Sequence, residues 1–466
     1  EISDSNPGSY EHYVVVQELT MNQRDRVDAI KKEWTQRGYL PRTFQVGGLF
    51  GIRGKVFDSR VILVGVGGMS DHGKAKSLRR ELEGKYGINA RIHSELTKHP
   101  GGLLELTGEG VEVTVRQRDV LWVAPKQGRA EEIRYTIPKV PKARGKGTET
   151  RTYSGRLIFS PDRKGQLAAI NKLGAERLLK GTVPSETYAS APKGALRAQA
   201  VAARNTIFAA IGVRNLADPY MLRSDVYDQV YKGLGAKTES TSRAVEATRG
   251  EVMFHGNQII EAVYSSNAGG FTENNENVWN TEPRPYLRGQ PDAPAREVPE
   301  EVRDGLSEDE IGAFLESDFP AHSSEAPIGS SRLYRWEEGV DAAEAVEWLK
   351  SHGHEIDRIE SAEVTQRGVS GRAMRVKVVG AGGGEAYVER ELNIRRLFDN
   401  LKSGLFEMSV ERREDGTIRR FEFEGAGYGH GVGMCQTGAI GMAADGDSYR
   451  DILTHYYRGI EIRELY

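Results

Sequence analysis

The sequence has little of several features that mark particular classes of protein. Cys435 is the only cysteine, which excludes a disulfide within the chain and a zinc cage built from several cysteines. No apolar run approaches the roughly 20 residues of a membrane-spanning helix. The formal net charge is only -3, so no strong field of one sign attracts nucleic acid. We therefore expect a soluble globular protein with neither nucleic-acid partners nor a membrane span.

The chain is long enough for two or three domains. Its first segment, 10–96, has the pattern of a small α+β unit in which strands and helices alternate. Strands are expected near 13–16, 61–64 and 90–93, and helices at 24–37 and 74–86. This order indicates a separate N-terminal domain.

Two further segments follow. In 97–150, short strands are expected first, and the polar stretch 138–150, rich in Lys, Pro and Gly, indicates a linker or exposed loop. The larger domain, 151–466, mixes helices and strands, and its acidic region 297–355 is interpreted as an elaboration of that domain. The fold class predicted for the whole chain is α+β.

The segment 183–206, VPSETYASAPKGALRAQAVAARNT, is the most informative for chemistry. It places Glu186 on a loop between Pro184 and a long alanine-rich helix. A lone acid beside a rigid helix can present a single proton donor to a cleft. The alternative is a helix-entry acid that only complements the positive end of the helix dipole.

A first glycine-rich segment, 260–279, offers many hydrogen-bonding groups with little bulk. An apolar strand is expected to end in small polar residues and a glycine turn, which suits a lip that binds a sugar but also fits an ordinary hairpin loop. The residues of this lip are Ser265, Ser266, Asn267, Gly269 and Gly270.

A second glycine-rich segment, 425–442, places His430 between two glycines and Gln436 shortly after. No Lys follows as it would in a phosphate-binding loop, so nucleotide binding is not expected. His430 is either a cleft residue or a hydrogen-bonded structural residue. Cys435 has no indicated base partner and is expected to be a small packed side chain.

Two tyrosines in 225–233, Tyr227 and Tyr231, are candidates for stacking on sugar rings. Aromatic residues in such a segment also serve as core residues. Both interpretations stay open from the residues alone.

In order along the chain, VPSE, ALRAQAVAARNT, DQVYKG, SSNAGGFT and GYGHGVGMCQTGAIGMA resemble the SpoIID/LytB family of peptidoglycan lytic transglycosylases over about 153–466. The resemblance implies that Glu186 is the general acid/base. It also implies a substrate cleft lined by Ser265, Ser266, Asn267, Gly269, Gly270, Tyr231, His430 and Gln436. Some members bind zinc through cysteines and a histidine near the QVY segment; 220–233 has neither residue type here, so no metal and no cofactor is predicted.

The first segment carries a resemblance of its own. YVVVQ, DRVDAIKKEWTQRGY, SRVILVGVGG and KAKSLRRELEGKYG resemble a SPOR-type domain, a ferredoxin-like peptidoglycan-binding module, over about 10–96. The alternative is another small α+β domain. The resemblance implies an affinity for glycan stripped of its peptides.

Together these resemblances predict cleavage of the MurNAc–GlcNAc bond of denuded peptidoglycan, with 1,6-anhydro-MurNAc ends as products. Hydrolysing glycosidases generally use two carboxylates, whereas attack by the substrate's own 6-hydroxyl needs only one. Glu273 and Glu276 are candidates for a second carboxylate, or solvated loop acids. The alternative function is a non-catalytic glycan-binding scaffold or an amidase-activating, LytB-like protein.

The expected partners are peptidoglycan glycan strands and, as a candidate, a cell-wall amidase. The chain begins with Glu1 rather than Met, as a trimmed mature sequence does. With the resemblances, this predicts an exported protein of the periplasm or cell envelope.

Overall fold

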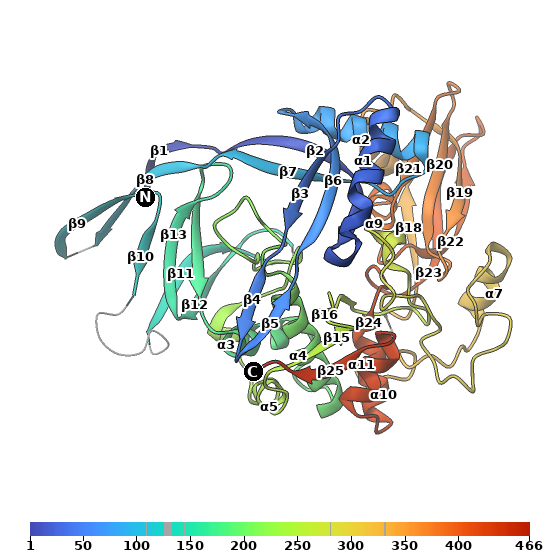
Figure 1. Ribbon diagram of the computed structural model, residues 1–466. Coiled ribbons are helices and arrows are strands. Elements are labelled where there is room, and N and C mark those ends of the chain that lie inside the picture. Colours follow the sequence, from blue (N-terminus) through green and yellow to red (C-terminus); the bar gives the residue numbers. More distant parts are fainter. Residues whose placement is uncertain (109, 125–132, 144, 280, 330–331) are drawn as a thin grey trace. The chain divides into compact units, whose positions relative to one another are not determined.

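The computed structural model describes residues 1–108, 110–124, 133–143, 145–279, 281–329 and 332–466. They form two compact units, the first from 1–189, 203–261 and 463–466 and the second from 190–202 and 262–462. Helices alternate with small sheets of two to four strands, which confirms the predicted α+β class (Figure 1). No helix in the described residues is long and apolar enough to cross a membrane.

The N-terminal part of the first unit has a ferredoxin-like topology. Its elements are β2 (Ser9–Thr20), α1 (Val27–Gln36), β3 (Arg42–Val46), β6 (Val61–Met69), α2 (His72–Tyr86) and β7 (Arg91–Lys98). The strands pair antiparallel in the order β3-β6-β2-β7. Val14 and Val64, on one face of this sheet, share a core with Trp34 of α1 and Leu82 of α2, so both helices cover the same face (Figure 1). Sequence and structure therefore agree on the N-terminal α+β fold, while its SPOR-like character stays a prediction.

A hairpin that the sequence did not predict interrupts this fold. β4 (Leu49–Ile52) and β5 (Lys55–Asp58) lie between β3 and β6 in the chain. Phe57 packs 5.8 Å from Phe254, ring centre to ring centre, and joins Ile52 against a core that includes Leu465. The N-terminal region thus shares a hydrophobic core with the rest of the first unit.

The polar stretch 138–150 is largely a hairpin instead of the predicted linker. β11 (Arg134–Pro141) pairs antiparallel with β12 (Thr148–Ser154), as far as Pro141 opposite Thr148. Residue 144 lies outside the described residues. The strand pairing satisfies backbone groups that a loop would leave to water.

Two helices follow next in the chain, and the second contributes residues to both units. α3 (Ala175–Glu186) begins shortly after strand β14 (Leu167–Lys172) ends. Arg204 of α4 (Lys193–Ala209) is fully buried and makes a bidentate ion pair with Glu176 at 2.8 and 2.9 Å. This pair fixes the start of α3 against the second half of α4.

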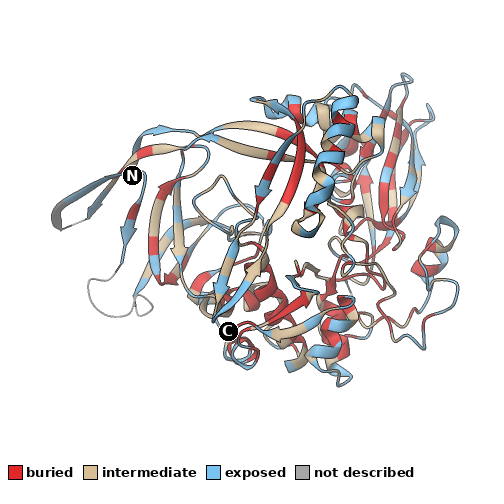
Figure 2. Cartoon of the chain, in the orientation of Figure 1, coloured by how far each residue is buried: buried red, intermediate tan, exposed pale blue. Residues whose placement is uncertain are grey.

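The second unit contains two three-stranded sheets. β18 (Arg335–Asp341), β23 (Ile418–Ala426) and β22 (Leu405–Arg412) form one, and β19 (Ile359–Arg367), β20 (Ala373–Gly380) and β21 (Glu385–Glu389) form the other. Both sheets share a core with α8 (Ala342–Ser351) and α9 (Glu391–Leu397). Figure 2 shows the buried positions along their strands.

The acidic region 297–355 does not behave as a single elaboration. α7 (Ile311–Glu316) packs with Phe271 and Leu405 in one core, whereas β18 and α8 contribute to the core of the two sheets. The two parts have different packing partners, so the acidic composition of this region does not delimit a structural unit.

Candidate active site

Glu186 is the last residue of α3 and is partly exposed. The prediction of a loop position was wrong, because the helix continues through Pro184, with Leu179 and Val183 fully buried. α4 begins only at Lys193, so Glu186 lies at the negative end of its own helix. A helix-entry role is thereby excluded, and the local dipole disfavours a negative charge there.

The carboxylate of Glu186 is oriented by the backbone of the DQVYKG segment. Its Oε1 atom accepts a hydrogen bond from the Val230 N–H at 2.5 Å. Val230 is buried, and the neighbouring Gln229 donates from Nε2 to the Ala203 carbonyl at 2.9 Å. The segment is thus held in place within the first unit, and its backbone orients the Glu186 carboxylate.

Tyr231 is a core residue. Its side chain is 6% exposed, its hydroxyl donates to Asn171 Oδ1 at 3.1 Å, and its ring lies 5.8 Å from that of Tyr153. Burial raises the pKa of the Tyr231 hydroxyl. The exposed aromatic ring of this segment is Tyr227, which is 67% exposed, so the placement argues against direct sugar stacking by Tyr231.

The two glycine-rich segments meet in the second unit. β17 (Tyr264–Ser265) pairs in parallel with β24 (Met434–Cys435). Asn267 and Tyr428 exchange backbone hydrogen bonds at 3.1 and 2.9 Å, and the Thr437 hydroxyl donates to the Ser266 carbonyl at 2.8 Å. The structure therefore brings together the predicted residues of both segments. These are Ser265, Ser266, Asn267, Gly269, Gly270, His430 and Gln436.

His430 is a neutral residue in this lip. Burial lowers its pKa to about 3, and the positive charges of Arg372 and Arg395 contribute. The Val432 N–H donates to Nδ1 at 3.0 Å, and the ring also bonds the Tyr264 backbone. His430 therefore orients neighbouring groups and is unsuited to proton transfer near neutral pH.

Gln436 bonds Gln199, a residue that the sequence did not indicate as part of the site. Its Nε2 atom donates to Oε1 of Gln199 at 3.0 Å, and Gln199 is 2% exposed on the first half of α4. Three buried polar atoms here have no hydrogen-bond partner among the described residues: Gln199 Nε2, Ser265 Oγ and Asn267 Nδ2. An unpaired buried polar atom lowers the stability of the fold. Such atoms are typical of a site that binds a ligand or water.

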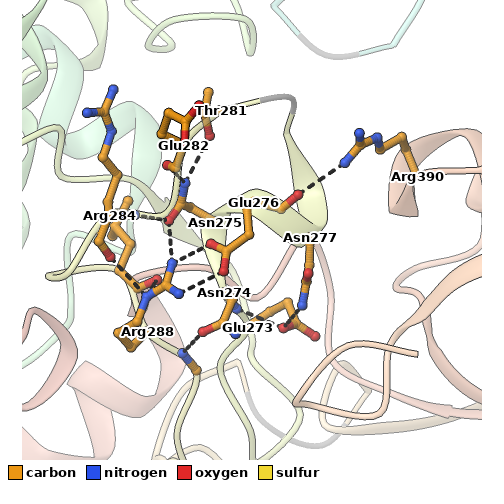
Figure 3. Close-up of polar contacts among 12 residues, drawn as sticks. Glu273, Asn274, Asn275, Glu276, Asn277, Thr281, Glu282, Arg284, Arg288 and Arg390 are labelled. Atoms are coloured by element: carbon orange, nitrogen blue, oxygen red, sulfur yellow. Dashed lines mark hydrogen bonds and ion pairs between the residues drawn. The ribbon is translucent and has the colours of Figure 1, made fainter. Parts of the chain in front are cut away.

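Glu273 and Glu276 are structural residues (Figure 3). Glu273 is fully buried and accepts hydrogen bonds from the Asn274 N–H, Asn277 Nδ2 and the Ser370 hydroxyl at 2.8, 2.9 and 2.6 Å. Glu276 makes a bidentate ion pair with Arg288. The expectation of solvated loop acids was wrong, because residues 273–277, the ENNEN cluster, are held by many polar contacts.

Arg372 ties this cluster to both glycine-rich segments. It is fully buried and donates to the Ser370 hydroxyl at 2.8 Å and to the carbonyls of Ala268 and Phe271 at 2.9 Å. A Cβ atom at Gly431, where φ is +73°, would lie 2.3 Å from the guanidinium carbon. Only glycine lets the chain pass this close in that conformation.

Cys435 is a capping residue. Its sulfur accepts hydrogen bonds from the backbone N–H groups of Ala268 and Gly438, at 3.1 and 3.2 Å, at the start of α10 (Gln436–Ala444). Burial, together with the nearby Asp292 charge, raises the pKa of the thiol. Cys435 is accordingly an unreactive structural thiol.

No group of three or more His, Cys, Asp or Glu side chains could hold a metal ion within the described ranges. The chemistry available to these residues is proton transfer by Glu186 in the first unit and hydrogen bonding by a compact polar lip in the second.

The chain is similar in sequence to several known proteins. The family model described as stage II sporulation protein, SpoIID, matches residues 163–255, and a domain of unknown function, DUF8618, matches 273–433. Stage II sporulation protein D of Bacillus subtilis is 28% identical over 340 residues, covering 69% of this chain and 83% of that protein. The amidase enhancer of the same organism is 30% identical over 299 residues, 60% of this chain and 39% of that protein. An uncharacterized protein of Brachyspira hyodysenteriae is 29% identical over 311 residues, 66% and 72% of the two chains.

Proposed function

This chain belongs to the SpoIID/LytB family, and we propose that it is a lytic transglycosylase that cleaves the MurNAc–GlcNAc bond of denuded peptidoglycan. The observation that carries the proposal is the position of Glu186, at the end of α3 and oriented by the Val230 N–H. Glu273 and Glu276, the two alternatives considered for a second carboxylate, are committed to structural contacts.

The reaction needs one acid. Glu186 donates its proton to the bridging oxygen as the bond from that oxygen to the MurNAc anomeric carbon breaks. The 6-hydroxyl of the same MurNAc then bonds to the anomeric carbon and returns its proton to Glu186. The products are a free 4-hydroxyl and a 1,6-anhydro end, without water or an enzymic nucleophile.

Two local features act on the protonated and the ionised state of Glu186. The negative end of α3 favours the protonated acid that starts the reaction. The Val230 N–H stabilises the carboxylate that forms when the proton has left. A residue that both gives and regains a proton requires this balance.

We further propose that the lip residues of the second unit bind the glycan. Ser265, Asn267 and Gln436 offer hydroxyl and amide groups of the kind that bind sugar hydroxyls. The unpaired atoms Ser265 Oγ and Asn267 Nδ2 support a polar ligand. The N-terminal ferredoxin-like region is proposed as a second, SPOR-like glycan-binding part of an exported protein.

The test is to digest amidase-treated sacculi with the protein and determine the masses of the products. Glu186→Gln is the informative variant, because a glutamine Oε1 can still accept the Val230 hydrogen bond and cannot supply the proton. Glu246→Gln is a matched control, since Glu246 is an exposed acid paired with Lys180 on the same unit. We expect anhydro products from the wild type and the control, and none from Glu186→Gln.

Products heavier by one water would indicate a muramidase instead. The amidase enhancer among the relatives favours one second candidate, activation of a cell-wall amidase. Unchanged glycan length together with faster peptide release by an added amidase would establish that function and exclude ours.

A further inference from the structure

Trp279 is an aromatic residue of the second unit that lies outside the set of residues proposed above for catalysis and glycan binding. It follows α6 (Asn275–Val278) directly and is partly exposed. Its ring meets the His430 ring edge to face, with 4.8 Å between the centres. A large apolar ring therefore lies at the lip formed by the two glycine-rich segments.

The turn that carries Trp279 is held by many contacts. The Trp279 N–H donates to the Asn275 carbonyl at 2.9 Å. The buried Asn275 side chain donates to Thr281 Oγ1 and the Glu282 carbonyl, both at 2.9 Å, and accepts from Arg284 and Arg288 (Figure 3).

A third anchor comes from Arg390, whose side chain donates to the Glu276 carbonyl at 3.1 Å (Figure 3). Arg390 has φ +79°, a conformation that costs energy for a residue with a side chain and persists only where surrounding contacts impose it. So many supporting contacts to one short turn are typical of a preorganised binding residue.

The partner of the Trp279 ring is also suited to an uncharged ligand. The His430 imidazole is neutral at physiological pH and carries hydrogen bonds to the backbone. It packs against the Trp279 ring without placing a charge beside it. Ser265 and Asn267, on the segment that pairs with the His430 loop, add polar groups for hydroxyls.

We propose that Trp279 stacks on the apolar C–H face of one pyranose ring of the glycan, and that the ENNEN cluster exists to position it. This inference rests on the proposed function, since it takes the glycan as the ligand. Flat aromatic rings combine a large apolar face with low conformational entropy, which suits them to sugar faces.

The experiment measures binding of denuded glycan strands, in co-sedimentation and by tryptophan fluorescence, for Trp279→Ala and Trp279→Phe. Tyr387→Ala is the control for binding, because Tyr387 is a 51% exposed aromatic residue on β21 of the same unit. Trp122→Phe, also at a 51% exposed position, is the control for fluorescence. Thermal unfolding monitors the fold of every variant.

We expect Trp279→Ala to weaken glycan binding by about tenfold or more, and Trp279→Phe to retain most of the affinity. The glycan-dependent fluorescence change should disappear in Trp279→Phe and persist in Trp122→Phe. Folded Trp279→Ala that binds within twofold of the wild type would overturn the inference, as would a fluorescence change that survives in Trp279→Phe.

The two proposals fail in different ways. Wild-type protein that binds glycan but releases no anhydro products refutes the lytic reaction, and the Trp279 variants then still decide the stacking. Wild-type protein that does not bind glycan refutes both.

Discussion

Glu186 in the first unit and Glu273 in the second both lie in segments that the sequence marks for chemistry, yet they are held in contrasting ways. Glu186 is partly exposed at the end of α3, where the Val230 N–H orients it. Glu273 is fully buried, with hydrogen bonds to both oxygens from four donor groups. One carboxylate is presented to its surroundings, and the other is a structural anchor.

The contrast supports the proposal that this chain uses a single acid. In the second unit, carboxylates serve to fix backbone around the glycine-rich lip, through Ser370, Arg372 and Arg288. The oxygens of Glu273 and Glu276 are occupied by these structural contacts. We therefore propose Glu186 for proton transfer and assign structural roles to Glu273 and Glu276.

The largest effect is expected for Glu186→Gln. Loss of the acid should lower the rate of anhydro-product release by about 10²–10⁴-fold or more, while the unfolding temperature stays close to that of the wild type. Product release is measured by mass spectrometry and stability by calorimetry. A variant with full activity would remove Glu186 from the chemistry and end the contrast.

Glu273→Gln should show the opposite behaviour. Removing a buried charge close to Arg372 is expected to lower the free energy of unfolding by about 3 kcal/mol, measured by urea denaturation. Residual folded protein should still release anhydro products below the unfolding transition. If instead stability is retained and activity is lost, Glu273 acts as a second carboxylate.

His430→Asn tests whether the lip histidine is neutral. The folded pKa of about 3 lies below the ordinary value of 6.5, so between these pH values only the unfolded chain binds the proton. Wild-type stability should therefore fall as the pH falls through this range, by up to about 1.4 kcal/mol per pH unit. An asparagine oxygen can replace the Nδ1 acceptor without this dependence. Equal pH slopes of unfolding free energy for both proteins would show that His430 is protonated in the fold.

The smallest effect is expected for Glu276→Gln. Its partner Arg288 and Glu276 itself are each about one-fifth exposed, with side-chain values of 23% and 22%. Loss of this pair should lower the free energy of unfolding by about 1 kcal/mol, as measured by urea denaturation. A loss as large as that of Glu273→Gln would mean that the ENNEN cluster acts as one cooperative network.

The family resemblance implied that the two glycine-rich segments line one cleft, and the structure brings these segments together. The catalytic role of Glu186 stays a prediction, and the loop position predicted for it was wrong. The end of α3 was misplaced because Pro184 and Gly181 normally break helices, whereas the burial of Leu179 and Val183 holds the helix together here.

Residues that act through distant contacts left no local signal. Gln199 lies on an alanine-rich helix with no special spacing, and it bonds Gln436, which is far away in sequence. Arg372 likewise bonds Ala268, 104 positions away in the chain, and Trp279 packs against the distant His430. One sequence shows residue types and periodicity, but the pairing of β17 with β24 rests on two residues in each strand, too few for a pattern.

The β4–β5 hairpin has a consequence for how this chain can be divided or recombined. Ile52 and Phe57 fill part of the core around Phe254 and Leu465. A shortened protein that starts after 96 would expose that core to water and invite aggregation. Exchange of the N-terminal region for another domain would leave the same gap unless the new domain carried an equivalent hairpin. The N-terminal region is therefore a structural part of the first unit and is not an independent attachment.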